Sequence, residues 1–364
     1  MSRRSDKPHI LIIGAGVSGL TTAYCLLEKG YNITVVSEKF APQNTSVVAG
    51  ALWEWPPAVC GYHHDQLSLH RSKRWCMDAY LRFFDLAEDP ATGAYIRPVN
   101  FFFREKITPG SFHYHKMSEL ENKVKNFRHS KEIIQEENIN QKIGLEDSYS
   151  HLAPMVNTDI YMSWLLAKVK AMDANIIQEK INGSLLENEV SILNRFRCSL
   201  IINCSGLGSR ELAGEYMYPL RGALVRVIND GSKAPQIRKA YCVSHDEGST
   251  RQDIVFIVPR GENLLVLGGL AEKDEWNTDI GLNNYAPVKE MYERCVEFMP
   301  ALADMDIDLK EPVRVGLRPF RAANVRLDWE QGSRIIHNYG HGGAGVTFSW
   351  GCSNEIVGMV NDFF

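Results

Sequence analysis

A glycine-rich turn near the N-terminus joins a short apolar run to a helical pattern. Residues 9–13 form the apolar run, Gly14-Ala15-Gly16-Val17-Ser18-Gly19 follows, and the helical pattern continues to Gly30. A second apolar run lies at residues 32–38. Parallel strands joined through a helix require a right-handed crossover. The first forty residues therefore predict the start of an open α/β sheet of the Rossmann type.

Each glycine of this turn has a separate expected role. Gly14 permits the tight turn, Gly16 lets the backbone approach a pyrophosphate, and Gly19 lets the helix pack closely on the strand. The free N–H groups at the helix start favour phosphate. Glu38 ends the second strand, where its carboxylate can bind ribose hydroxyls and would repel the 2′-phosphate of NADP. An ordinary glycine turn and a surface acid are the alternatives.

The turn by itself leaves NAD and FAD open as cofactors. A flavoprotein reduced by a nicotinamide usually carries a second glycine fingerprint, and the only candidate, residues 206–211, lacks the third glycine. A single complete fingerprint favours either a flavin enzyme reduced by its substrate or a plain NAD enzyme.

The composition is that of an ordinary globular protein. The chain has 364 residues, of which 45% are hydrophobic and 23% charged, and its net charge is -4. This length suggests about two domains, and the charge provides no basic surface for nucleic acid or anionic membranes. No apolar stretch approaches the roughly 18 residues of a membrane span. The eight cysteines are scattered, which is typical of reduced thiols, and we expect a cytoplasmic protein.

The nucleotide-binding domain is expected to be discontinuous, because strands that end at glycine recur in the middle and at the end of the chain. We assign residues 1–60, 150–212 and 315–364 to it. Residues 61–149 and 213–314 form a second, substrate-binding domain of the α+β class. Its β-rich runs between 220 and 270 predict an antiparallel sheet.

Six segments spread over nearly the whole chain resemble the D-amino-acid oxidase family of FAD enzymes. They are IIGAGVSGLTTAYCL, VVSEKFAPQNTSVVAGALW, IINCSGLGS, HDEG…FIVP…LLVLGG, VGLRPFRAANVRLD and IIHNYGHGGAGVTFSWGC, and the last two are the most specific. The resemblance implies that the first domain binds FAD.

The resemblance also implies which residues line the FAD site beyond the glycine turn. They are Glu38, Lys39, Thr45, Ser46, Ala49, Gly50, Lys180, Ile181, Ser205, Gly206, Arg318, Gly342, Gly343, Ala344, Gly345, Val346 and Thr347. The last six cover the flavin pyrimidine edge in this family. Backbone N–H groups at a helix start can stabilise the negative charge that reduction places there.

The catalytic centre that the resemblance implies contains Arg318, Phe256, Glu54 and Gly343. Arg318 is the family's substrate-carboxylate anchor, and a guanidinium suits this role because it donates two parallel hydrogen bonds. Bound in this way, the substrate directs its Cα–H toward flavin N5 for hydride transfer. The alternative is a structural salt bridge, which we favour for Arg321 and Arg326.

Two positions depart from the family pattern. The family usually has two tyrosines beside the substrate where this chain has Phe256 and Gln252, so Tyr339 or another group would have to supply a hydroxyl. Glu54 stands where the family often has a neutral amide, and it could pair with a positive substrate side chain or lie on a solvent-facing turn. A basic amino acid, a cyclic imino acid or a specialised intermediate therefore fits as substrate.

The expected activity is FAD-dependent oxidation of a free amino or imino acid, with O2 as acceptor and hydrogen peroxide as product. A secondary-amine oxidase of the sarcosine or glycine oxidase type, a dehydrogenase with another acceptor, an NAD enzyme and a flavin protein without turnover are the alternatives. The sequence leaves open whether the protein forms a homodimer. We expect no metal, although His63-His64-Asp65 and the pair His113 and His115 have residue types that bind metals. Cys352 should be a buried helix residue.

Overall fold

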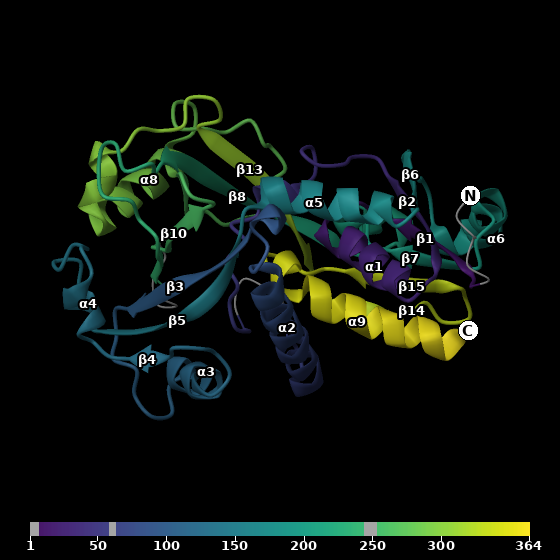
Figure 1. Cartoon of the computed structure of the whole chain (residues 1–364), viewed down its shortest axis with the longest axis horizontal. Coiled ribbons are helices and arrows are strands. Elements are labelled where there is room, and N and C mark those ends of the chain that lie inside the picture. The colour runs from purple at the N-terminus through teal and green to yellow at the C-terminus, as the bar shows by residue number, and fades with distance from the viewer. Residues whose placement is uncertain (1–6, 58–62, 244–252) are drawn as a thin grey trace.

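The computed structural model describes residues 7–57, 63–243 and 253–364, and these fold around two sheets that lie side by side (Figure 1). The described strands of the first sheet lie in the order β14 (Arg326–Trp329), β15 (Ile335–Tyr339), β7 (Leu200–Asn203), β1 (His9–Ile13), β2 (Asn32–Ser37) and β6 (Asn175–Gln178). Every pair in it is parallel except β14 with β15. The predicted start of the sheet is confirmed.

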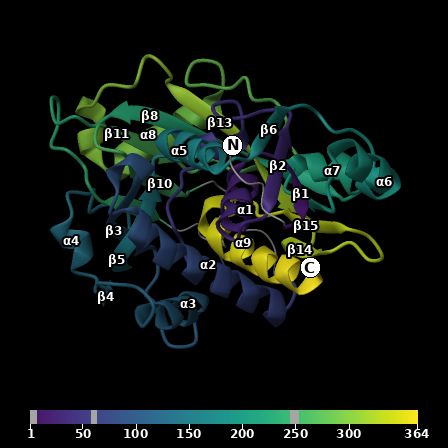
Figure 2. The same cartoon turned by 45° about the vertical axis from the view of Figure 1, so that its right-hand side comes forward.

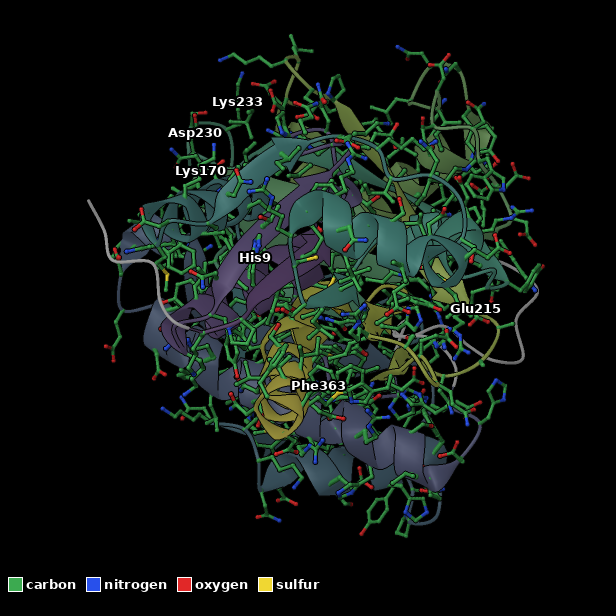
Figure 3. The ribbon with its side chains drawn as sticks, turned by 90° about the vertical axis from the view of Figure 1, so that its right-hand side faces the viewer. His9, Lys170, Glu215, Asp230, Lys233 and Phe363 are labelled. Atoms are coloured by element: carbon green, nitrogen blue, oxygen red, sulfur yellow. The ribbon has the colours of Figure 1, made fainter. Side chains whose placement is uncertain are left out.

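Alternation along β1 explains why helices cover both faces of this sheet. Ile10 and Ile12 belong to a core shared with α1 (Val17–Glu28), α5 (Thr158–Ala171) and α9 (Gly345–Phe363), whereas Leu11 and Ile13 pack toward α6 (Leu185–Phe196). Successive side chains of a strand point to opposite faces, so an apolar run is buried on both. His9 lies at the start of β1 (Figure 3), and its ring Nε2 forms a 2.8 Å hydrogen bond with Thr34 Oγ1 of β2.

The second sheet is mixed rather than purely antiparallel. Its described strands lie in the order β12 (Glu272–Lys273), β8 (Met217–Ile228), β11 (Leu264–Gly268), β10 (Val255–Arg260), β9 (Ala240–Val243), β3 (Ala94–Phe103), β5 (Asp147–Val156) and β4 (Arg128–His129), and β13 (Val313–Arg321) pairs with β8. The pair β3 and β9 is parallel. One face packs on α8 (Ala286–Phe298), and the other faces the first domain.

The remaining described elements are four helices and four 3-10 turns, of which only α2 is long. They are α2 (Gln66–Leu86), α3 (Phe112–Glu121), α4 (Ile133–Glu136) and α7 (Ser209–Leu212), with the 3-10 turns η1 (Thr45–Val48), η2 (Pro90–Thr92), η3 (Gly206–Gly208) and η4 (Pro300–Asp304). The polar stretch from 104 to 150 supplies α3, β4 and α4 at the edge of the second sheet.

The α/β fold class is confirmed, but the expected domain boundaries need correction. Boundaries at 150 and 315 cut through β5 and β13, and both strands pair in the second sheet. Helix α2, expected in the second domain, runs along α9 of the first (Figure 2). A Cβ on Gly351 of α9 would lie 2.2 Å from the Cα of Trp75 on α2, so the two helices approach backbone to backbone. Local patterns do not show such long-range partners.

Candidate active site

A cavity of about 910 Å³ lies where the two sheets meet, and it brings together residues from all parts of the chain. Its wall includes every site residue expected from the sequence except Gly19. Glu38, Lys39 and Lys180 line one end, and the second sheet lines the other.

The glycine turn has the geometry that its sequence predicts. Gly14 has a φ of 111°, and a Cβ there would lie 2.4 Å from the carbonyl oxygen of Cys204. A Cβ on Gly19 would lie 1.9 Å from the carbonyl oxygen of Gly14, so Gly19 serves helix packing and does not reach the cavity. The hydroxyl of Ser46 accepts a 2.9 Å hydrogen bond from the Val17 amide. One of the helix-start N–H groups thus already has a partner within the chain.

The far end of the cavity is open to solvent. Glu38, Lys39 and Lys180 are exposed, and Ile181 is buried beside them. On the neighbouring wall the hydroxyl of Ser205 donates a 2.7 Å hydrogen bond to Asn203. Charged groups at an open end and backbone along the middle suit a long, polar ligand.

Two asparagines in the cavity wall were not predicted. The side-chain amide of Asn44 donates a 3.0 Å hydrogen bond to the Ala15 carbonyl, but its buried Oδ1 has no partner among the described residues. Asn338 Oδ1 is likewise buried and has no hydrogen-bond partner among the described residues. A buried unpaired acceptor costs about 1–3 kcal/mol, so a ligand with hydroxyl or N–H donors is expected beside each. The glycine cradle and these acceptors together fit an extended dinucleotide such as FAD.

The loop before α9 is tied to the strand that carries Arg318. The Gly342 amide donates a 3.0 Å hydrogen bond to the carbonyl of Pro319, and the Ala344 amide donates to His341. Helix α9 then begins at Gly345, so the N–H groups of Gly345, Val346 and Thr347 have no acceptor within the helix. Gly343 is exposed and lines the cavity.

Arg318 is a cation without an acidic partner among the described residues. Its Nη1 donates to two carbonyls, at 3.2 Å to Leu270 and 3.4 Å to Arg221, and no described carboxylate lies within ion-pair distance. Burial lowers its pKa to about 10, so it stays charged at neutral pH. A Cβ on Gly222 would lie 2.4 Å from Nη1, so the guanidinium occupies the space beside that glycine. A buried guanidinium with only carbonyl partners suits an anionic ligand.

The two neighbouring arginines differ from Arg318 as predicted. Arg321 pairs with Glu215 at 3.0 Å, and Arg326 pairs with Glu330 at 2.8 Å. Glu215 follows α7 and lies near the surface (Figure 3). Both arginines are structural.

A row of side chains crosses the second sheet and forms the cavity floor. Phe256 of β10 lies opposite Cys242 of β9, Cys242 opposite Phe101 of β3, and Phe101 opposite Tyr149 of β5. All four line the cavity. Since neighbouring strands are about 4.8 Å apart, the row extends about 14 Å from Phe256 to Tyr149. This floor is long and mostly apolar.

Phe256 lies at the end of the floor that contacts the first domain. Tyr149 provides the hydroxyl group of the floor. A Cβ on Gly50 would lie 2.6 Å from the Phe256 ring, which explains the glycine. Tyr339, the expected replacement for the missing tyrosine, has a hydroxyl that accepts from Arg326 at 3.0 Å and donates to Glu215 at 3.4 Å. The Tyr149 hydroxyl has no hydrogen bond to any described residue, and the side chain lines the cavity. Gln252 lies outside the described residues.

Glu54 lines the cavity with its side chain 33% exposed, and it is not a lone charge. Its Oε1 accepts a 2.9 Å hydrogen bond from Lys116 Nζ of α3, and both residues are part of the wall. The neighbouring Trp53 and Trp55 are 2% exposed, and their ring N–H groups donate to Cys76 and Glu119. Both tryptophans pack in the core.

The histidine clusters do not assemble a metal site in the described part of the chain. No described group of three His, Cys, Asp or Glu side chains could hold a metal. His63 and His64 bond to Ser72 and to the Ala322 carbonyl, both at 2.9 Å. His113 and His115 lie on α3 rather than on a strand.

Cys352 is buried in α9 and carries a free thiol. No described helix has the length and apolarity to cross a membrane.

Comparison with known proteins agrees with this geometry. The profile of the FAD dependent oxidoreductase family matches residues 9–359. The chain is 31% identical to a D-amino-acid oxidase of Rubrobacter xylanophilus, with 96% of this chain and 95% of that protein covered. It is 28% identical to a D-aspartate oxidase of Homo sapiens, with 98% and 96% covered.

Among solved structures, a glycine oxidase of Bacillus cereus superposes with a TM-score of 0.74 at 15% identity, with 98% of this chain and 96% of that chain covered. That likeness shows the fold. Together, the family profile, the relatives and the cavity that fits FAD show that the chain belongs to the FAD-dependent oxidoreductase family and is an enzyme of the D-amino-acid oxidase type.

Proposed function

We propose that the enzyme oxidises the Cα–N bond of free D-amino acids with neutral side chains, using O2 as the final electron acceptor. The observation that carries the proposal is Arg318, a cation in the cavity wall with no described carboxylate partner. Its strand is hydrogen-bonded to the loop at Gly342, so the anchor and the expected flavin-covering amides are held in one arrangement.

Arg318 would bind the substrate carboxylate through two parallel hydrogen bonds and fix both its position and its tilt. Bound FAD supplies the hydride acceptor, and its reoxidation by O2 gives hydrogen peroxide. A substrate with a neutral amine loses Cα–H with its electron pair and becomes an iminium ion. Water then converts the iminium to a 2-oxo acid and ammonium. No residue is needed as a base for the Cα–H bond.

The substrate side chain would lie along the floor from Phe256 toward Tyr149. Phe101 and Cys242 make this path apolar, and the Glu54 carboxylate at its side is already compensated by Lys116. A basic substrate side chain therefore gains less binding energy from Glu54 than it would gain from an unpaired carboxylate. Neutral apolar and aromatic D-amino acids fit this wall best.

A peroxide-coupled assay of the purified enzyme tests the proposal. The substrates are D- and L-amino acids, cyclic imino acids and N-methylglycine, with an artificial electron acceptor in parallel. We expect the highest kcat/KM for neutral D-amino acids with peroxide formed in step. A preference for N-methylglycine would favour the secondary-amine oxidase, and turnover only with the artificial acceptor would identify a dehydrogenase.

A further inference from the structure

The segment Thr45–Gly50, here called the cofactor loop, is held by side chains of other elements. Its residues Thr45, Ser46, Val48, Ala49 and Gly50 line the cavity. The carbonyl of Val47 accepts hydrogen bonds from Thr158 Oγ1 at 2.6 Å and from Arg314 Nη1 at 3.2 Å. The carbonyl of Ala49 accepts a hydrogen bond of 2.5 Å from Arg260 Nη2. Two loop carbonyls are thus bound by side chains of α5, β13 and β10.

Arg260 makes two of the connections in this arrangement. It stands at the end of β10, the strand that also carries Phe256. Its Nη2 binds the Ala49 carbonyl directly, and its Nη1 donates to the Thr158 hydroxyl, which in turn donates to the Val47 carbonyl. One guanidinium therefore holds both loop carbonyls, one of them through a relay.

Fold stability does not explain an arginine at this position. Arg260 is 3% exposed, and no described carboxylate lies within ion-pair distance of it. Its Nε has no partner among the described residues, and burial lowers its pKa to about 10. Arg314 differs: burial opposes its charge, but hydrogen bonds to Glu311 and Asp159 outweigh burial and raise its pKa. A buried, unpaired cation contributes less to folding than an apolar side chain of similar size.

We propose that Arg260 is a positioning residue for FAD: it fixes the cofactor loop to the substrate-binding sheet, so that FAD affinity depends on the second sheet. The contact between Phe256 and Gly50 lies on the same strand and the same loop. Movement of the loop would disturb the cofactor and the wall of the substrate cavity together. The sequence pattern FIVPR carries no signal for this role, because Ala49 is distant in sequence.

The test measures FAD affinity of the apoprotein by fluorescence titration, together with the melting temperature of the apoprotein. Arg260→Met should weaken FAD binding at least about tenfold, because two charge-assisted connections are lost. The melting temperature of the apoprotein should stay near the wild-type value. Arg260→Lys, which has one donor group for the Ala49 carbonyl, should recover part of the affinity.

Arg97→Met is the matched control, since Arg97 is a mostly buried arginine of the same sheet that pairs with Glu262 at 2.8 Å. It should leave FAD affinity within twofold of wild type. Thr158→Val, which keeps the shape but removes the relay, provides a second test if Arg260→Met fails to fold, and it too should weaken FAD binding. FAD affinity within twofold of wild type for Arg260→Met or Thr158→Val would overturn the proposal. An equal loss of affinity in Arg97→Met would overturn it as well.

Discussion

Arg318 lines the cavity, and its described hydrogen-bond partners are carbonyl groups. Arg318→Ala removes this guanidinium. Loss of a hydrogen-bonded, poorly solvated charge pair costs about 2–5 kcal/mol of transition-state binding. This corresponds to a fall in kcat/KM of about 30-fold to about 5,000-fold. The assay is steady-state peroxide formation with the best neutral D-amino acid, over a range of concentrations wide enough to resolve kcat and KM.

FAD content is the control for this variant. Arg318 donates to the carbonyls of Leu270 and Arg221 and to no described residue of the glycine turn or the cofactor loop. The variant should therefore keep its FAD. Gly222→Ala is a companion change, because a Cβ there would lie 2.4 Å from Arg318 Nη1 and displace the guanidinium. It should raise KM although the arginine is still present. Arg318→Ala activity within twofold of wild type would refute the anchor role.

Three further predictions concern the charge pair, the glycine turn and pH. Lys116→Met removes the cation that pairs with Glu54 and should raise relative kcat/KM for D-lysine, whereas Glu54→Gln removes the carboxylate of this pair and should favour D-aspartate. Equal substrate rankings in both variants would exclude the charge pair from specificity. Gly19→Ala places a Cβ 1.9 Å from the Gly14 carbonyl oxygen and should abolish FAD retention, measured by flavin absorbance of the purified protein. Burial lowers the pKa of His151 to about 4, below its unfolded value of 6.5, so its contribution is present above pH 6.5 and is lost as pH falls toward 4. Urea unfolding at pH 8 and pH 5 should differ by about 2 kcal/mol less in His151→Gln than in wild type, and an unchanged difference would contradict the assignment.

The local parts of the fold and the site follow from the sequence. The glycine turn and the first parallel strands depend on residues within short segments, where turn geometry and strand alternation leave a direct pattern. The anchor role expected of Arg318 came from the family resemblance alone. Gly14 and Gly19 have the close backbone contacts expected of them, and Arg318 lines the cavity.

The rest depends on contacts between residues far apart in sequence. Tyr149 reaches the cavity only because β5 pairs with β3, and the expected boundary at 150 overlooked that pairing. Lys116 lies on a polar helix with no local sign of the partner it finds in Glu54. Asn44 follows a proline and glutamine in an irregular segment, and its unpaired oxygen is visible only with the cavity around it.

The most direct test is anaerobic mixing of the purified, FAD-containing enzyme with neutral amino acids. We expect a neutral D-amino acid to bleach the absorbance of oxidised flavin within one turnover and to yield one 2-oxo acid per flavin, while its L-enantiomer leaves the spectrum unchanged. Bleaching by neither enantiomer of any neutral amino acid, or equal bleaching by both, would contradict the proposed function.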